Sequence, residues 1–137
     1  PPERFAGARV VECARSENLG RVIATNARTA AIVMSHNYER DLDYFDELTR
    51  SDVAYLGVLG PRARTERMLG DLETRGRACG DAMRSRIHAP IGLDVGGEGA
   101  EAIALSIIAE ISAVMYGRSG ASLRKGEASI HARPSLV

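Results

Sequence analysis

The sequence predicts an α/β fold in which helices cover both faces of a doubly wound parallel sheet. Short apolar runs of strand length alternate four times with amphipathic segments of helical period, the order expected of parallel strands joined by helices. Two of these runs, residues 29–35 and 53–59, are apolar at most positions. Such runs are typical of strands that are covered on both faces.

Length, charge and cysteine content together limit the possible classes of protein and of binding partner. A chain of 137 residues is long enough for one domain with its own core. Eighteen basic and 18 acidic residues give zero formal charge, so no overall field attracts nucleic acid or anionic lipid. The longest apolar stretch is far short of a membrane span. Cys13 and Cys79 lack metal or redox spacing, which suits a reducing cytoplasm, and we expect neither nucleic acid nor a membrane as partner.

The first 50 residues contain two predicted strands and one predicted helix. The run ARVVEC at residues 8–13 is the first strand, and an amphipathic stretch with Leu19, Val22 and Ile23 on one face follows it. The run TAAIVMS at 29–35 is the second strand. The helix after it should turn four residues inward: Tyr38, Leu42, Phe45 and Leu48. Its acidic residues should point outward: Glu39, Asp41, Asp43, Asp46 and Glu47.

The third and fourth strands are predicted at residues 54–59 and 87–93. Gly60 and Pro61 turn the chain into a helix, and proline suits the first helical turn. The inward side of that helix should consist of Thr65, Met68, Leu69 and Leu72. Residues 81–85 are expected to form a single helical turn. Pro90 places the fourth strand near a sheet edge, because proline removes a ladder donor.

A long helix is predicted from Ala100 until Gly117, which is a good stop signal. One face is aliphatic: Ile103, Ile107, Ile108, Ile111, Val114 and Met115. The other is small: Ser106, Ala109, Ser112 and Ala113. We expect the aliphatic face to pack on the sheet and the small face to meet a helix of this chain or of a second copy. Glu110, at the border, needs a structural partner if it is buried.

Two further expectations concern assembly and the end of the chain. A small helix face and an uncovered sheet edge together predict a homodimer or other tight oligomer. Residues 118–137 are small, polar and weakly basic, and they are predicted to be a disordered tail. The chain begins at Pro1 rather than methionine, which is the pattern of a segment from a longer protein.

Candidate binding residues follow from the topology, because ligands of such sheets gather at the carboxyl ends of the strands. After the second, third and fourth strands these ends contain Ser35, His36, Asn37, Gly57, Gly60, Arg62, Arg64, His88, Gly92 and Asp94. No G-x-G-x-x-G or G-x-x-x-x-G-K-[ST] pattern is present, and the three histidines have no zinc-site spacing. No nucleophile–base pair stands out, so no catalytic or metal-binding residue is assigned.

Each candidate also has a purely structural interpretation. Arg62, Arg64 and Arg67 lie near a helix start, where cations are disfavoured. Anion binding explains their presence, since helix starts bind phosphates, but so does a solvated basic face. His36 can simply form a turn, and His88 can pack against backbone. Asp94 can form an Asx-type turn.

Three blocks of the sequence resemble the XdhC/CoxI family. They are Met-Ser-His-Asn at 34–37, Tyr-Leu-Gly-Val-Leu-Gly at 55–60, and Arg-Ile-His-Ala-Pro-Ile-Gly-Leu-Asp at 86–94, followed by Glu101 and residues 103–107. The family comprises accessory proteins of xanthine dehydrogenase and carbon monoxide dehydrogenase. The resemblance implies that residues 1–117 form the Rossmann-like C-terminal domain of such a protein.

By this resemblance the protein is a chaperone for molybdenum cofactor (molybdopterin). It would bind the cofactor, support its sulfuration and deliver it to an apo-enzyme of the xanthine dehydrogenase type. That makes it a maturation factor rather than an enzyme. The fold class alone suggests an alternative, an NAD(P)-binding oxidoreductase domain, and a bare dimerisation module is a third possibility.

The chain departs from the family pattern at three places. Pro61 stands where serine is usual, and Gly99 with Ala100 stands where a Thr-Pro helix start is usual. In the family, a first strand with a Gly-x-Gly-His turn and a second strand precede the segment Pro-Glu-Arg-Phe, found here at residues 2–5. The expected sheet therefore lacks its first βαβ unit, and any ligand site in this chain is half of one.

Overall fold

The computed structural model describes residues 2–125. The strands are β1 (Ala30–Val33), β2 (Tyr55–Val58) and β3 (Ile87–His88). The α-helices are α1 (Leu19–Val22), α2 (Tyr38–Thr49), α3 (Arg62–Thr74), α4 (Asp81–Arg84) and α5 (Gly99–Met115). Three 3-10 turns are η1 (Pro2–Phe5), η2 (Ser16–Asn18) and η3 (Leu123–Lys125).

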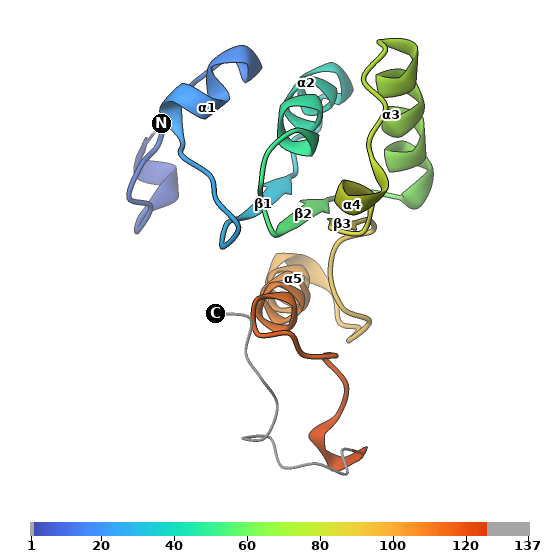
Figure 1. Ribbon diagram of the computed structural model, residues 1–137. Helices are drawn as coiled ribbons and strands as arrows, with labels where there is room; N and C mark the ends of the chain where they lie inside the picture. Colours follow the sequence, from blue (N-terminus) through green and yellow to red (C-terminus); the bar gives the residue numbers. More distant parts are fainter. Residues whose placement is uncertain (1, 126–137) are drawn as a thin grey trace.

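The described strands form one parallel sheet in the order β1-β2-β3. Ala30 pairs with Tyr55 and Val33 with Val58, while Leu56 pairs with Ile87 on the other side of β2. Helices α2 and α3 lie on one side of the sheet and α5 lies on the other (Figure 1). The predicted fold class, a doubly wound parallel α/β sheet, is therefore confirmed.

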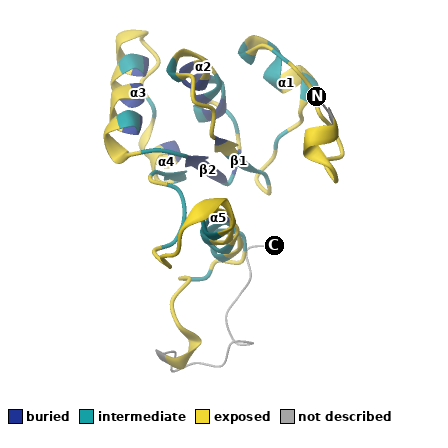
Figure 2. Cartoon of the chain, turned by 180° about the vertical axis from the view of Figure 1, so that it is seen from behind, coloured by how far each residue is buried: buried dark blue, intermediate teal, exposed yellow. Residues whose placement is uncertain are grey.

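The main core lies between the sheet and helices α2 and α3. Its completely buried side chains come from α2, from α3 and from β2 with the residues just before it: Phe45, Val53, Leu56, Val58, Met68 and Leu72. In Figure 2, the buried residues of α2 and α3 are coloured dark blue along one side of each helix. The predicted inward residues of α3, Thr65, Met68, Leu69 and Leu72, are all buried. Helical periodicity thus located this side of the fold correctly.

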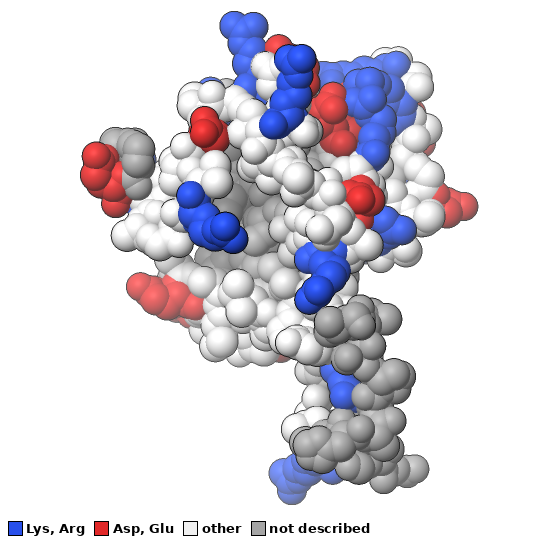
Figure 3. Space-filling view, turned by 60° about the vertical axis from the view of Figure 1, so that its left-hand side comes forward, with Lys and Arg blue, Asp and Glu red and all other residues white. Residues whose placement is uncertain are grey.

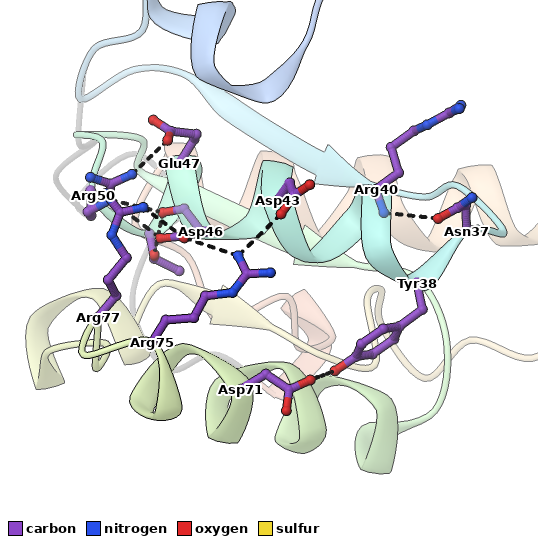
Figure 4. Close-up of polar contacts among 11 residues, drawn as sticks. Asn37, Tyr38, Arg40, Asp43, Asp46, Glu47, Arg50, Asp71, Arg75 and Arg77 are labelled. Atoms are coloured by element: carbon purple, nitrogen blue, oxygen red, sulfur yellow. Dashed lines mark hydrogen bonds and ion pairs between the residues drawn. The ribbon is translucent and has the colours of Figure 1, made fainter.

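The prediction that all the acids of α2 point outward is wrong for Asp41 and Asp46, which are 2% and 3% exposed. Each carboxylate is compensated by basic partners: Asp41 pairs with Arg64 at 2.9 Å, and Asp46 is surrounded by three arginines. Asp46 lies 2.9 Å from Arg77, 3.4 Å from Arg75 and 3.5 Å from Arg50 (Figure 4). This cluster connects the end of α2 to the end of α3.

The strand predicted at residues 8–13 is absent from the described chain. Residues 10–15 have no regular secondary structure, and Val10 and Val11 are exposed. An isolated strand cannot satisfy its backbone groups without a ladder partner, and the sheet order places no described strand beyond β1. The fourth predicted strand, observed as β3, is shorter than predicted, because Pro90 has no N–H to donate to a ladder.

The prediction for the two faces of α5 is wrong in part. Ile107 is buried, but Ile103 and Ile108 are 50% and 62% exposed. Ser106, from the small face, packs against the turn after β3 instead of against a helix, and its Oγ donates to the Leu93 carbonyl at 2.8 Å. A small residue is required at this position because the helix approaches the backbone of Gly92 closely.

The remaining predictions concern the C-terminal residues and membranes. Of the predicted disordered tail, residues 118–125 are described and include η3, while residues 126–137 lie outside the described residues. No helix in the described part of the chain is long and apolar enough to cross a bilayer. Within residues 2–125, no group of three or more His, Cys, Asp or Glu side chains could hold a metal ion.

Candidate functional site

The candidate site lies at the edge of the sheet where the strands end. The Leu59 amide donates to the Val33 carbonyl at 2.9 Å, and the Ile91 amide donates to the Val58 carbonyl at 3.2 Å. These bonds continue the sheet pairing past the strand ends. They bring the turn after β1, the turn from β2 to α3 and the turn after β3 side by side, as the parallel topology predicts.

A pocket of about 230 Å³ opens at this edge, between the β2–α3 turn, the loop 90–97 and the first turns of α5. Its lining consists of Leu59, Gly60, Pro90, Ile91, Leu93, Gly96, Gly97, Ala102, Ile103 and Ser106. The walls are mainly aliphatic, and the floor is backbone with small side chains. Of the predicted site residues, Gly60 lines the pocket directly and Gly92 lies between two residues that do.

Two predicted site glycines have a packing reason for being glycine. A Cβ at Gly57 would lie 2.2 Å from Cδ1 of Ile91, so Gly57 makes the space into which Ile91 inserts. Gly92 has φ +104°, and a Cβ there would lie 2.1 Å from Oγ of Ser106. Both glycines therefore shape the pocket wall by close approach.

Ser35, Asp41 and Arg64 form a polar cluster that joins the end of β1 to α2 and α3. Ser35 donates to Asp41 Oδ1 from its Oγ at 2.5 Å and from its amide at 3.3 Å. Arg64 Nη2 donates to Asp41 Oδ2 at 2.9 Å. Sequence reasoning missed Asp41, although its spacing of i+3 from Tyr38 and i−4 from Phe45 places it on the apolar face of the helix.

The structure separates the two arginines predicted to act together. Arg64 is paired with Asp41 and lies over the Tyr38 ring, 5.5 Å from its centroid, where Arg67 also stacks at 4.1 Å. Arg62 is exposed and lines a different small pocket with Thr65, Glu66, Leu69, Arg84, Ile87 and Ala89. Arg62 is therefore the arginine of this pair that is open to a ligand.

Burial raises the pKa of Tyr38 to about 12, and the hydrogen bond to Asp71 adds to the shift. Tyr38 Oη donates to Asp71 Oδ2 at 2.6 Å, so the ring that supports both arginines is itself fixed to α3 (Figure 4). The aromatic platform at the start of α2 is thus part of the scaffold behind the site.

The other predicted residues of the first turn serve local structure or face solvent. The Asn37 side chain accepts from the Arg40 amide at 2.9 Å and so caps α2. His36 and Asp94 are exposed. On the face shown in Figure 3, basic and acidic side chains both occur, separated by broad uncharged areas. Local groups rather than an overall field must therefore select a ligand.

His88 is packed beneath the site instead of lining the pocket. Its ring stacks on Tyr55 with centroids 4.4 Å apart, and its Nδ1 lies 3.6 Å from Glu110 Oε1. Tyr55 Oη donates to the same Glu110 oxygen at 2.6 Å. Burial, and then the hydrogen bond to Glu110, raise the pKa of Tyr55 far above its ordinary range. Glu110 thus has the structural partners that its sequence position predicts, while Tyr55 was missed because it falls in an apolar run.

Cys79, in the loop after α3, is partly buried, and burial raises the pKa of its thiol. The neutral thiol is the weaker nucleophile and metal ligand. The arrangement around Cys79 therefore favours packing over chemistry.

A parallel sheet covered on both faces, with a pocket at the carboxyl ends of its strands, defines a Rossmann-like domain. A family model described as the XdhC Rossmann domain matches residues 2–111. The chain therefore belongs to the XdhC family, as its sequence blocks predicted.

Two curated relatives are similar over most of this chain. One is named as a probable xanthine dehydrogenase subunit of Bacillus subtilis (strain 168), 37% identical over 82 residues, which are 60% of this chain and 22% of the relative. The other is the uncharacterized protein YqeB of Escherichia coli (strain K12), 30% identical over 111 residues, which are 80% of this chain and 20% of the relative. The chain thus spans about a fifth of the length of either relative.

A solved structure described as a xanthine dehydrogenase from Bacillus halodurans has the same fold. Its TM-score is 0.69 at 21% sequence identity, over 93% of this chain and 34% of that one. At this identity the likeness concerns the fold alone.

Proposed function

We propose that this domain binds molybdenum cofactor and belongs to an accessory protein that matures a cytoplasmic molybdoenzyme of the xanthine dehydrogenase type. The observation that supports this most is the match of residues 2–111 to the XdhC Rossmann domain. The name of the B. subtilis relative refers to xanthine dehydrogenase as well. In this role the cofactor is cargo, and the domain is a carrier rather than a catalyst.

The residues present fit a pterin that carries a phosphate. The aliphatic walls of the pocket suit a flat ring. The residue before α3, Pro61, makes no side-chain cap, so the first amides of that helix are open to a phosphate. Arg62, exposed at the same helix start, can supply two parallel donors to phosphate oxygens.

The pocket is too small to enclose a whole cofactor. Its volume of about 230 Å³ lies below the roughly 300 to 1,000 Å³ typical of small-molecule sites. In this proposal the pocket holds one part of the cofactor, and other protein segments cover the rest.

The most direct test is a fluorescence titration of molybdopterin and, separately, of NADPH into the full-length protein and its Arg62→Glu variant. Reversing this charge removes a phosphate donor, so we expect molybdopterin affinity to fall by about tenfold. Arg67→Glu is the matched control, because Arg67 stacks on Tyr38 instead of facing the helix start. Equal affinities in Arg62→Glu and wild type would end the phosphate-site proposal, and binding of NADPH alone would favour the oxidoreductase alternative.

The carrier role has a separate test. Wild-type protein loaded with molybdopterin should restore activity when it is mixed with an apo-xanthine dehydrogenase. Free cofactor at the same concentration is the control. Activation no faster than with free cofactor would contradict the maturation role while leaving cofactor binding intact.

We also propose that the protein is a homo-oligomer. Leu105 and Ile108 lie three residues apart on one side of α5 and are 66% and 62% exposed, and such apolar exposure to water is unfavourable. Sedimentation of the full-length protein over a hundredfold concentration range tests this. A monomer at every concentration would contradict it.

A further inference from the structure

The wall of the candidate pocket depends on a loop that has little regular structure of its own. Residues 89–97 leave β3, pass the cis Ala89–Pro90 peptide and reach α5 without forming a further helix or strand. Ile91 and Leu93 of this loop line the pocket. The position of the loop must therefore come from side chains that hold it.

Helix α5 holds this loop through two polar side chains. The Gly92 amide donates to Glu110 Oε1 at 3.0 Å. One residue further on, the Leu93 carbonyl accepts from Ser106 Oγ at 2.8 Å. Since Ser106 and Glu110 are four residues apart, they lie on the same face of the helix. Together, Glu110 and Ser106 bind the Gly92 amide and the Leu93 carbonyl in the turn after β3.

A second set of contacts fixes the Glu110 carboxylate itself. Tyr55 Oη donates to Oε1 at 2.6 Å, and His88 Nδ1 lies 3.6 Å from the same oxygen. Tyr55 is completely buried in β2, and its raised pKa keeps its proton available as a donor. The side chain of Glu110 is 14% exposed. Glu110 therefore connects the rigid centre of the sheet to the irregular loop through one oxygen.

The same turn is fixed from the sheet side by packing. Ile91 inserts into the space above Gly57, and its amide continues the pairing to Val58. This packing fixes how closely the turn approaches the sheet, but it supplies no hydrogen-bond acceptor for the Gly92 amide. Only the contact to Glu110 satisfies the Gly92 amide among the hydrogen bonds of the described residues.

We propose that Glu110 is a positioning residue of the candidate cofactor site. It sets the place of Ile91, Gly92 and Leu93, and thereby the width of the pocket, without touching the ligand. Tyr55 supports its carboxylate from below. The proposal rests on the proposed function, because the pocket matters only if this domain binds a cofactor there.

The first arm of the test measures the loop without any ligand. Hydrogen exchange of the peptide covering residues 89–97 is followed by mass spectrometry in full-length protein. Glu110→Leu removes the acceptor, and exchange in this peptide should rise by about tenfold. Glu110→Gln keeps a carbonyl acceptor and should stay near wild type. Exchange in residues 41–49 of α2 should not change in either variant, because that helix packs on the opposite face of the sheet from α5.

The second arm measures molybdopterin affinity of the same proteins by fluorescence titration. We expect about tenfold weaker binding for Glu110→Leu and rescue to near wild type in Glu110→Gln. The control for the hydrogen-exchange measurement is Glu101→Leu, which replaces an exposed acid on the same helix. If Glu110→Leu fails to fold, Tyr55→Phe replaces it. This variant keeps the ring on His88 and removes one donor, so smaller changes in the same direction are expected.

Each result decides something different. The proposal would be overturned if hydrogen exchange at residues 89–97 were unchanged in Glu110→Leu. If Glu110→Leu does not fold, the same criterion applies to Tyr55→Phe. Faster exchange with unchanged molybdopterin affinity would overturn it as well, since Glu110 would then be merely structural. If the wild type binds no molybdopterin, the proposed function fails, and with it the role of Glu110 at a cofactor site. In that case the exchange arm still shows whether Glu110 holds the loop.

Discussion

The two faces of the sheet are held by different kinds of interaction. The face covered by α2 and α3 has a continuous apolar core in which Phe45, Leu56 and Met68 have no exposed surface. On the face covered by α5, only Ile107 of that helix is buried to a similar extent, and polar bonds from Ser106 and Glu110 make the connection. The α2/α3 face therefore serves as the scaffold of the domain. The α5 face has little buried apolar surface, and its polar contacts hold the loop of the candidate site.

The largest expected difference between the two faces is in the cost of truncating an apolar side chain. Phe45→Ala leaves a cavity in the core and should lower the free energy of unfolding by about 3–5 kcal/mol. Ile108→Ala, on the exposed side of α5, should change it by less than about 0.5 kcal/mol. Urea denaturation of both variants measures this. Similar losses would mean that α5 is covered as tightly as α2.

A second difference concerns the two buried acids of the α2 face. Asp41→Ala leaves the Arg64 guanidinium, whose side chain is 21% exposed, without its carboxylate. An abandoned buried charge is costly, so we expect a loss of about 3 kcal/mol. Asp46→Ala should cost less, about 1–2 kcal/mol, because its arginine partners are 37% to 43% exposed and can be hydrated. Denaturant midpoints that reverse this order would contradict the account of Arg64.

A third prediction tests the close approach on the α5 face. Ser106→Ile introduces an aliphatic side chain into a helix that is already rich in isoleucine, so the sequence pattern alone predicts little harm. It also removes the hydrogen bond to Leu93 and crowds Gly92. Overpacking of this kind costs about 2 kcal/mol. Ile108→Ser, on the exposed side of the same helix, should be nearly neutral, because Ile108 is 62% exposed. Thermal unfolding in which Ile108→Ser is the more damaging change would mean that the helix is rotated.

The smallest effect is a pH dependence on the α2 face. The folded-state pKa of Tyr38 is about 12, above its ordinary value of 10.0. The unfolded chain therefore loses this proton first, and the stabilisation is complete below pH 10 and disappears as the pH rises toward 12. Tyr38→Phe should lower stability at pH 7 by about 1 kcal/mol and flatten the decline above pH 10 relative to wild type. Parallel unfolding curves for the two proteins would show that Asp71 does not hold this hydroxyl.

The same contrast explains what the sequence could and could not predict. Helical periodicity located Phe45, Met68 and Leu72 because burial on that face is a matter of apolar pattern alone. It failed for α5, where the small residue Ser106 faces inward because the backbone at Gly92 comes close. That approach is a contact between Ser106 and a turn outside the helix, which the periodicity of the helix itself does not encode. For the same reason the prediction put Ile103 and Ile108 on the sheet.

The structure brings only some of the predicted site residues together at the carboxyl ends of the strands, and it adds others that were not predicted. Topology alone brings Gly60 and Gly92 to the strand ends, since parallel strands end together. The partners of Asp41 and Tyr55, which are Arg64 and Glu110, are 23 and 55 residues away in sequence. The position of Asp41 on the apolar face of its helix was a usable signal, but a single sequence does not identify partners this distant. The first predicted strand failed for a related reason, because a strand exists only where a neighbour offers a ladder.

One measurement tests the central claim that the α2 face is scaffold and the α5 face shapes the site. Molybdopterin affinity is determined for the full-length Leu72→Ala and Glu110→Leu variants at a temperature where both are folded. We predict that Leu72→Ala, although the less stable protein, binds within about threefold of wild type, whereas Glu110→Leu binds about tenfold more weakly. Equal losses of affinity, or a larger loss in Leu72→Ala, would contradict the division between scaffold and site.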